Sequence, residues 1–210
     1  MPFISSPLIY ICNKMLSAGT FPTSLKFSQV FPLFKNVNET EMSDYRPISI
    51  LTSFPKIFEK VIYNRLLQHT KENNIIYMDQ YGSKNNSSNE LAIFKLINQT
   101  LLHINNKSSV CDIFCDLTEA WDTVNHDILI SKLEYCGIIG RTNKLIKSYL
   151  SDWYQRVTIK TSHVSNCTSA WESVKHAVPQ GSILGPLLFH KWFTSISIRY
   201  CLAGSICRWH

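Results

Sequence analysis

Apolar residues recur at three- and four-residue steps in several segments of the chain, and this spacing predicts amphipathic helices. Residues 1–18 have such spacing, and Gly19 and Pro22 should end the helix that they form. A second helix is predicted over 56–69, where one side of the pattern is apolar and the other polar. Pro55 suits the first turn of this helix, because a proline there gives up no intrahelical hydrogen bond. The helix over 56–69 should be half-buried.

A third helix should follow a polar loop of Gly, Asn and Ser residues at 78–89. Ser87 and Glu90 have the spacing of a capping box, in which each side chain satisfies a backbone N–H at the start of a helix. The apolar positions of this helix are Ile93, Ile97, Leu101 and Ile104. Two more helices are predicted over 126–136 and 142–152.

Four segments have the pattern of strands. Residues 30–35 and 110–115 are short and mostly apolar, 154–161 alternates between apolar and polar residues, and 173–178 leads into a Pro-Gln-Gly turn. Ser182 is placed to cap one more helix after that turn. We find no internal repeat and no linker, so the sequence predicts one α/β (α+β) unit with helices packed on a small, mainly antiparallel sheet.

Composition narrows the class of protein only a little. The 210 residues are 45% hydrophobic, enough for an ordinary core, and a formal net charge of +6 fits a partner with a phosphate backbone without identifying one. The seven cysteines include no C-x-x-C pair, so we interpret them as reduced. Lys14 interrupts the apolar run at the start, which argues against a signal peptide or membrane span. We therefore expect an intracellular protein, cytoplasmic or nuclear.

Asp116 is the first residue with candidate chemistry. It ends the predicted strand 110–115, where its carboxylate and the carbonyl of Leu117 could supply the hard oxygen ligands that a divalent cation prefers. An aspartate at this point could equally cap the following helix. The spacing alone leaves both interpretations open.

A second candidate lies at Gln180 and Gly181. Glycine lets backbone approach a ligand closely, and the Gln180 amide offers both a donor and acceptor. A plain turn would have the same sequence. Lys35, Arg46 and Lys84 precede the Asp116 strand and could meet a triphosphate, although most such residues are simply solvated.

Taken in order, four segments form one pattern: DYRPISILTSFPKIFEKVIYNRL, QYGSKNNSSNELAI, CDLTEAWDTVNHDILISKLEYCGI and VPQGSILGPLLF. This series resembles the reverse transcriptase of jockey- and CR1-like non-LTR retrotransposons. The resemblance runs from about residue 5 to 189, and such an ordered series is highly specific. It implies an incomplete right-hand polymerase with fingers and palm.

The resemblance also implies a reaction and its partners. The family's polymerase binds an RNA template, a DNA primer and a deoxynucleoside triphosphate, and transfers a nucleotide with the help of two magnesium ions. Asp116 matches the first metal-binding aspartate, which makes it the expected catalytic residue, and Leu117 supplies the adjacent carbonyl. The rest of such a retrotransposon protein, including its endonuclease and thumb, would lie outside this chain.

Five further positions match the family's nucleotide-binding residues. Gln180 and Gly181 match the motif that lies along the nucleotide and template, and Lys35 and Arg46 match basic fingers residues near the triphosphate. Trp121 stands where the family has a phenylalanine under the sugar, and its larger ring would crowd that pocket. In the polar loop, the family's Gly-Phe-Arg is replaced by Gly-Ser-Lys. The fingers are therefore expected to be looser.

The end of the chain departs from the family. No Tyr/Phe-Ala-Asp-Asp motif follows the Leu-Leu-Phe at 187–189, and Asp122 and Asp127 lie beyond the strand end, where they cannot easily replace its carboxylates. Residues 190–194 can be encoded so that a shift of one base reads Ile-Asn-Gly-Leu, and 206–210 so that it reads Tyr-Ala-Asp-Gly. We hypothesise a frameshift near Phe189. The expected organisation is a partial polymerase domain over 1–189 and an out-of-frame tail over 190–210.

Three functions follow from this pattern. The chain could be an enzyme, as a fragment of a larger RNA-directed DNA polymerase, a non-catalytic RNA-binding module, or part of a decayed element with no selected role. Missing carboxylates favour the last two for this molecule.

Overall fold

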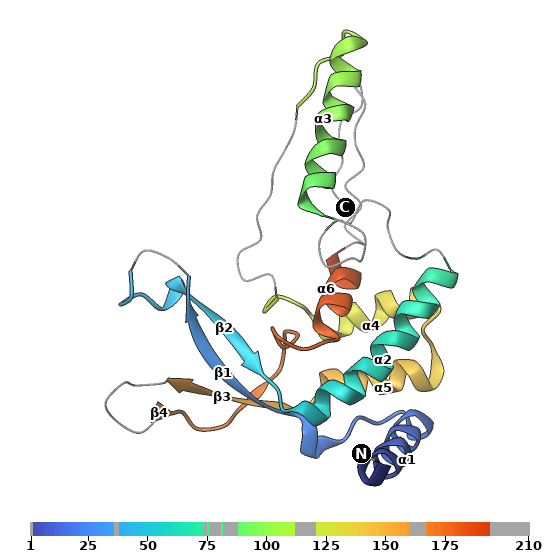
Figure 1. Ribbon diagram of the computed structural model, residues 1–210, viewed down its shortest axis with the longest axis vertical. Helices are drawn as coiled ribbons and strands as arrows, with labels where there is room; N and C mark the ends of the chain where they lie inside the picture. The colour runs from blue at the N-terminus through green and yellow to red at the C-terminus, as the bar shows by residue number, and fades with distance from the viewer. Residues whose placement is uncertain are drawn as a thin grey trace.

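The computed structural model describes residues 2–35, 38–73, 75, 81, 88–111, 121–159 and 167–193. These residues form the helices α1 (Pro2–Ala18), α2 (Ser53–Glu72), α3 (Asn89–Asn105), α4 (His126–Tyr135), α5 (Gly140–Leu150) and α6 (Gly185–Phe193). The strands are β1 (Phe27–Phe34), β2 (Tyr45–Ile50), β3 (Trp153–Ile159), β4 (Cys167–Thr168) and β5 (Glu172–Val174), with short 3₁₀ helices at Thr23–Leu25 and Met42–Asp44. In Figure 1 the sheet extends to one side of a group formed by α2, α4, α5 and α6, while α3 projects away from both. The mixed α/β class predicted from sequence is confirmed.

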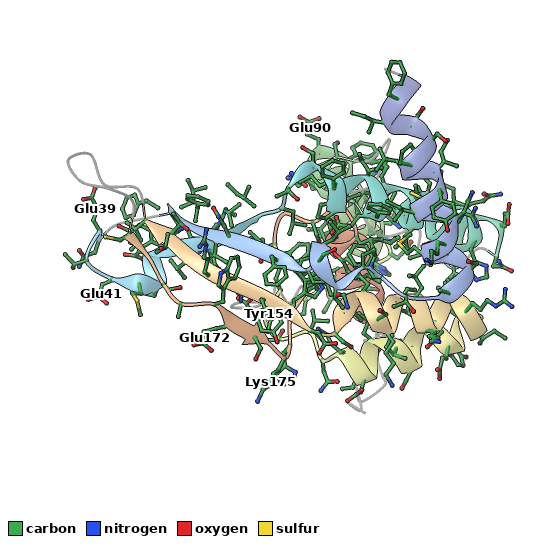
Figure 2. The ribbon with its side chains drawn as sticks, turned by 90° about the horizontal axis from the view of Figure 1, so that it is seen from below. Glu39, Glu41, Glu90, Tyr154, Glu172 and Lys175 are labelled. Atoms are coloured by element: carbon green, nitrogen blue, oxygen red, sulfur yellow. The ribbon has the colours of Figure 1, made fainter. Side chains whose placement is uncertain are left out.

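The sheet has the strand order β2-β1-β3-β4, and β5 also pairs with β3. β1 and β2 form an antiparallel hairpin in which Gln29 is opposite Ile50 and Phe34 is opposite Tyr45. Figure 2 shows the far end of this hairpin, marked by Glu39, well away from the helices. β4 and β5 are antiparallel to β3, so antiparallel pairs predominate, as expected.

One pairing is parallel and joins distant parts of the chain. β1 lies beside β3 with Phe27 opposite Tyr154 and Val30 opposite Val157. Paired residues in a parallel ladder point to the same face of the sheet, and side chains alternate along each strand. Ser28 and Val30 therefore share one face with Gln155, whereas Phe27 and Tyr154 share the other. This pairing brings the N-terminal hairpin next to the strand that precedes the Pro-Gln-Gly turn.

The core lies where the helices meet the base of the sheet. Phe21, Tyr149 and Trp153 are almost fully buried and form an aromatic cluster, with Phe21 edge-on to Tyr149 at 5.1 Å. Lys26 is also buried, and its ammonium donates to the carbonyl oxygen of Ser148 at 2.6 Å, near the end of α5. A cation is favourable there because carbonyls at a helix C-terminus lack intrahelical partners. The sheet and α5 are thus fixed to each other.

The predicted proline in the first turn of α2 is confirmed, and local signals mark both ends of α4. Pro55 lies in the first turn of α2. Asn125 caps α4, accepting from the N–H groups of Asp127 and Ile128 at 3.0 and 3.1 Å. Gly137 has φ +79° just beyond α4, in the left-handed region that glycine favours at helix ends.

Several predicted boundaries were wrong. The cap of α3 is Ser88, not Ser87, and it accepts from the Leu91 N–H at 3.2 Å. Val110, placed in a strand by its apolar neighbours, is not in one, and residues 112–120 lie outside the described residues. The predicted strand 173–178 is limited to Glu172–Val174, because Ala177 adopts φ +83° and turns the chain away from the sheet.

Within the described ranges, no helix is long and apolar enough to cross a membrane. The described cysteines at positions 12, 111, 136 and 167 are free thiols.

Candidate functional site

The segment between β5 and α6 is attached to the chain ahead of α4. Ala177 donates its N–H to the Val124 carbonyl at 3.1 Å, and Val178 donates to the Trp121 carbonyl at 3.3 Å. The His126 ring nitrogen Nε2 lies 2.7 Å from the Ala177 carbonyl oxygen. These contacts bring the chain that follows the Asp116 region next to the Pro-Gln-Gly turn.

The turn itself rests on β2. Ser49 donates its backbone N–H to the carbonyl oxygen of Gln180 at 2.8 Å. Gly181 has φ +125°, and a Cβ atom there would lie 2.4 Å from the Ser49 carbonyl oxygen. Only glycine fits this position without moving backbone. The sequence predicted that the backbone at Gly181 would approach a ligand closely, and in the structure its close neighbour is the backbone of Ser49.

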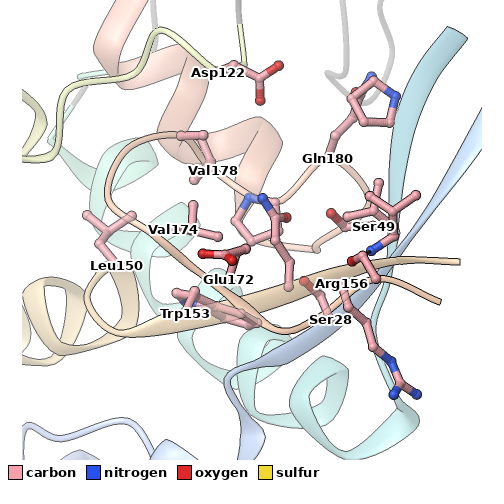
Figure 3. A pocket seen from close by; sticks show the side chains of 17 residues that line it. Ser28, Ser49, Asp122, Leu150, Trp153, Arg156, Glu172, Val174, Val178 and Gln180 are labelled. Atoms are coloured by element: carbon pink, nitrogen blue, oxygen red, sulfur yellow. Dashed lines mark hydrogen bonds between the residues drawn. The ribbon is translucent and has the colours of Figure 1, made fainter. Parts of the chain in front are cut away.

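A pocket of about 380 Å³ lies between the turn and the sheet (Figure 3). The sheet contributes residues that share one face, and the turn contributes the opposite wall. The lining includes Ser28, Val30, Pro47, Ser49, Trp153, Gln155, Val157, Glu172, Val174, Val178, Pro179 and Gln180. Gln180 is half-buried at its edge. The pocket thus combines apolar walls with a few polar groups, the usual composition of a small-molecule site.

Its charged groups are mainly acidic. The exposed Asp122 and Glu172 both line the pocket. Arg156 also contributes to the wall, but its guanidinium points away from the pocket in Figure 3 and lies 4.7 Å from the centre of the Trp171 ring. The described lining therefore favours hydrogen-bond donors or cations over a bare anion.

The structure brings only some of the sequence-predicted site residues together. Gln180 lines the pocket, and Gly181 follows it in the turn. Trp121 instead packs on Phe189 of α6, with ring centres 4.8 Å apart, and stands 3.2 Å from where a Cβ on Gly185 would be. The large Trp121 ring is therefore used to pack against α6.

The basic residues predicted to meet a triphosphate lie on the β1–β2 hairpin. Lys35 follows β1 and is exposed, and its backbone N–H donates to the Asp44 carbonyl at 2.7 Å. Arg46 is exposed opposite Leu33. Because side chains alternate along a strand, Arg46 is on the face opposite Ser49, away from the pocket. Asp116, Leu117 and Lys84 lie outside the described residues.

Two residues of the site were not identified from sequence. Ser49 lies within a strand, and its role in holding the turn is seen only from its backbone hydrogen bond to Gln180, which is distant in the sequence. The sequence analysis did not single out Glu59 of α2, which is fully buried beneath the turn. Its pKa is raised by burial, while hydrogen bonds from Ile183 and Tyr149 act in the opposite direction. The one sign of this burial in the sequence is that Glu59 directly follows Phe58, which is itself buried.

Comparison with known proteins decides the family. The family model described as reverse transcriptase (RNA-dependent DNA polymerase) matches residues 35–202, which is most of the chain. The chain belongs to the reverse transcriptase family. This match covers β2 and the Pro-Gln-Gly turn, and leaves α1 and all of β1, with Ser28 and Val30 of the pocket lining, outside it.

Three curated RNA-directed DNA polymerases are similar in sequence to most of the chain. The chain is 32% identical over 189 residues to the probable RNA-directed DNA polymerase from transposon BS of Drosophila melanogaster, which covers 87% of the chain and 20% of that protein. It is 30% identical to the RNA-directed DNA polymerase from mobile element jockey of the same fly, over 87% of the chain and 19% of the relative. The jockey polymerase of Drosophila funebris is 28% identical with the same coverage. The chain spans about one fifth of the length of these reverse transcriptases.

Proposed function

We propose that the chain is the fingers-and-palm portion of an RNA-directed DNA polymerase of a non-LTR retrotransposon, and that its pocket receives the base and sugar of a deoxynucleotide paired with an RNA template. The observation that carries this proposal is the docking of Gln180 and Gly181 on Ser49. It places the turn that matches the family's nucleotide motif over a pocket of about 380 Å³.

The pocket has groups suited to a nucleoside. The Gln180 amide can donate and accept, and Ser28 and Gln155 add polar atoms on the sheet side. Val30 and Val178 offer apolar surface for a sugar or base. Glu172 accepts hydrogen bonds only, so it favours hydroxyl and amino groups over phosphate. The nucleoside, and not the triphosphate, is therefore the part of the substrate that fits here.

The reaction proposed for the intact polymerase is nucleotidyl transfer. The primer 3′ oxygen forms a bond to the α-phosphorus of the incoming nucleotide, and the bond to pyrophosphate breaks. Magnesium would supply charge stabilisation in that reaction. Asp116 and the Leu117 carbonyl are the proposed ligands, and among the described residues no three His, Cys, Asp or Glu side chains converge on a metal position.

A second function is supported by the sequence, because the 210 residues contain no Ala-Asp-Asp motif. The chain would then bind template and primer without turnover, as an RNA-binding module. Its net charge of +6 suits a phosphate backbone, and such binding should weaken steeply with salt.

Binding of a labelled RNA-template and DNA-primer duplex to residues 1–210 tests the proposal. The complementary deoxynucleotide should tighten the complex more than a mismatched one, and Gln180→Ala should remove that difference. Gln29→Ala is the matched control, because Gln29 is half-buried like Gln180 but lies on β1 and points away from the pocket face of Ser28. Duplex binding with no response to nucleotide would favour the RNA-binding module. No duplex binding at low salt would contradict both functions.

A further inference from the structure

Glu59 occupies a position where a carboxylate is costly. It lies in α2 between core positions, is fully buried and has the buried Phe58 and Ile62 as neighbours in the helix. Removing a carboxylate from water is unfavourable unless its oxygens are hydrogen-bonded. An apolar residue would fill this position at a lower cost in free energy. The hydrogen bonds of Glu59 therefore explain the presence of a glutamate better than packing does.

Both carboxylate oxygens of Glu59 are used. Oε1 accepts from the Tyr149 hydroxyl at 2.9 Å, and Oε2 accepts from the Ile183 backbone N–H at 2.6 Å. The Leu184 backbone N–H also hydrogen-bonds to Glu59. These two N–H groups directly precede α6, where backbone donors lack intrahelical partners. Glu59 thus joins α2 and α5 to the segment that leads from the Pro-Gln-Gly turn into α6.

The same segment is held at neighbouring points. Ser182 closes a turn by donating its N–H to the Pro179 carbonyl at 3.0 Å, and its hydroxyl accepts from the Gly185 N–H at 2.9 Å. Its side chain is also hydrogen-bonded to Tyr149. Gln180 therefore lies between two anchors, Ser49 on one side and Glu59 on the other.

We propose that Glu59 is a positioning residue: with Tyr149 it fixes the backbone of residues 180–184 and thereby sets where Gln180 meets the pocket. Its importance for nucleotide rests on the proposed function, whereas its effect on the turn does not. The Glu59 carboxylate itself does not line the pocket and acts through Gln180.

Three variants separate this role from general stability. Glu59→Met fills the space but leaves the Ile183 and Leu184 N–H groups without an acceptor. Glu59→Gln keeps one acceptor oxygen for the turn and can donate to the Tyr149 hydroxyl. Tyr149→Phe removes only the hydroxyl. Amide hydrogen exchange at residues 180–184 is measured in each variant, with Leu133 of α4 as the internal reference for global opening.

Glu59→Met should speed exchange at Ile183 and Leu184 by about tenfold or more relative to Leu133, as expected for the loss of a hydrogen bond to a charged group. Glu59→Gln should stay close to wild type, and Tyr149→Phe should have a smaller effect than Glu59→Met, because it removes the partner of Oε1 but leaves the acceptor of the Ile183 N–H in place. The preference for complementary nucleotide should fall in Glu59→Met and return in Glu59→Gln.

Equal exchange in Glu59→Met and wild type would overturn the proposal, and so would equal effects of Met and Gln. If Glu59→Met does not fold, amide hydrogen exchange in the wild-type chain tests the proposal. Rapid exchange at Ile183 and Leu184 under native conditions would show that Glu59 does not hold these two N–H groups. Altered exchange without any nucleotide response, even in wild type, would contradict the proposed function and leave the positioning role intact.

Discussion

Ser49 and Gln180 are joined by a backbone hydrogen bond of 2.8 Å, although one lies in the N-terminal hairpin and the other in the turn before the last described helix. The contact fixes the distance between the β1–β2 hairpin and the turn that forms the opposite wall of the pocket. Its stability depends on Gly181, because the Ser49 carbonyl oxygen occupies the space that a side chain at 181 would need.

Gly181→Ala should therefore destabilise the fold by about 3 kcal/mol, since it adds a backbone clash to an unfavourable φ. Gly140→Ala is the matched control: Gly140 has φ +63°, but a Cβ there meets no atom within 4 Å. It should cost about 1 kcal/mol from conformation alone. Urea unfolding measures both values, and equal losses would show that the contact with Ser49 does not constrain position 181.

Glu59 should make stability depend on pH. Burial raises the pKa of Glu59 above its ordinary value, so the folded state binds a proton more tightly than the unfolded state does. Its contribution to stability is then full below the unfolded pKa and is lost as pH rises through the folded pKa. Tyr149, whose own pKa is raised well above its ordinary value by burial, and Lys56 are the titratable groups that act on it.

The glutamine of Glu59→Gln cannot titrate. As pH rises from acid towards neutral, the unfolding free energy of wild type should therefore fall relative to that of Glu59→Gln. Urea unfolding across that range measures the difference. A difference that is constant with pH, or that moves in favour of wild type, would contradict the buried position of Glu59.

The helices could be predicted because their signals are local. Asn125 before α4 and Gly137 after it are recognisable in a short window, and Leu129 and Leu133 form the buried seam that their spacing predicts. Where two neighbouring residues have the same capability, the local signal fails: either Ser87 or Ser88 could cap α3, and the structure uses Ser88.

The candidate site was less predictable because its contacts are not local. Gln180 and Gly181 could be identified from their motif, but the partner Ser49 depends on how β2 meets the turn. The side of the sheet on which Arg46 lies depends on register, and a shift of one residue would reverse it. Glu59 looks like a solvated position of an amphipathic helix, and only the packing of α5 and α6 shows it to be buried.

Residues 1–210 should not extend a DNA primer on an RNA template. Asp116 alone supplies too few carboxylates to hold magnesium against a triphosphate, because this ion requires nearly ideal octahedral oxygen coordination. Incorporation of labelled deoxynucleotide is compared with a reaction without protein and with an active reverse transcriptase on the same duplex. Extension above background that Asp116→Ala abolishes would contradict this prediction.

The most direct test of the proposed pocket is to map where a nucleotide binds. Residues 1–210 are irradiated with the RNA–DNA duplex and a photoreactive azido-deoxyuridine triphosphate, and the modified peptides are identified by mass spectrometry. The account predicts adducts on the pocket face, at 28–30, 47–49 and 178–181, that excess complementary nucleotide suppresses. Suppressible adducts confined to the opposite face, at Arg46, Tyr154 or Trp171, would contradict it.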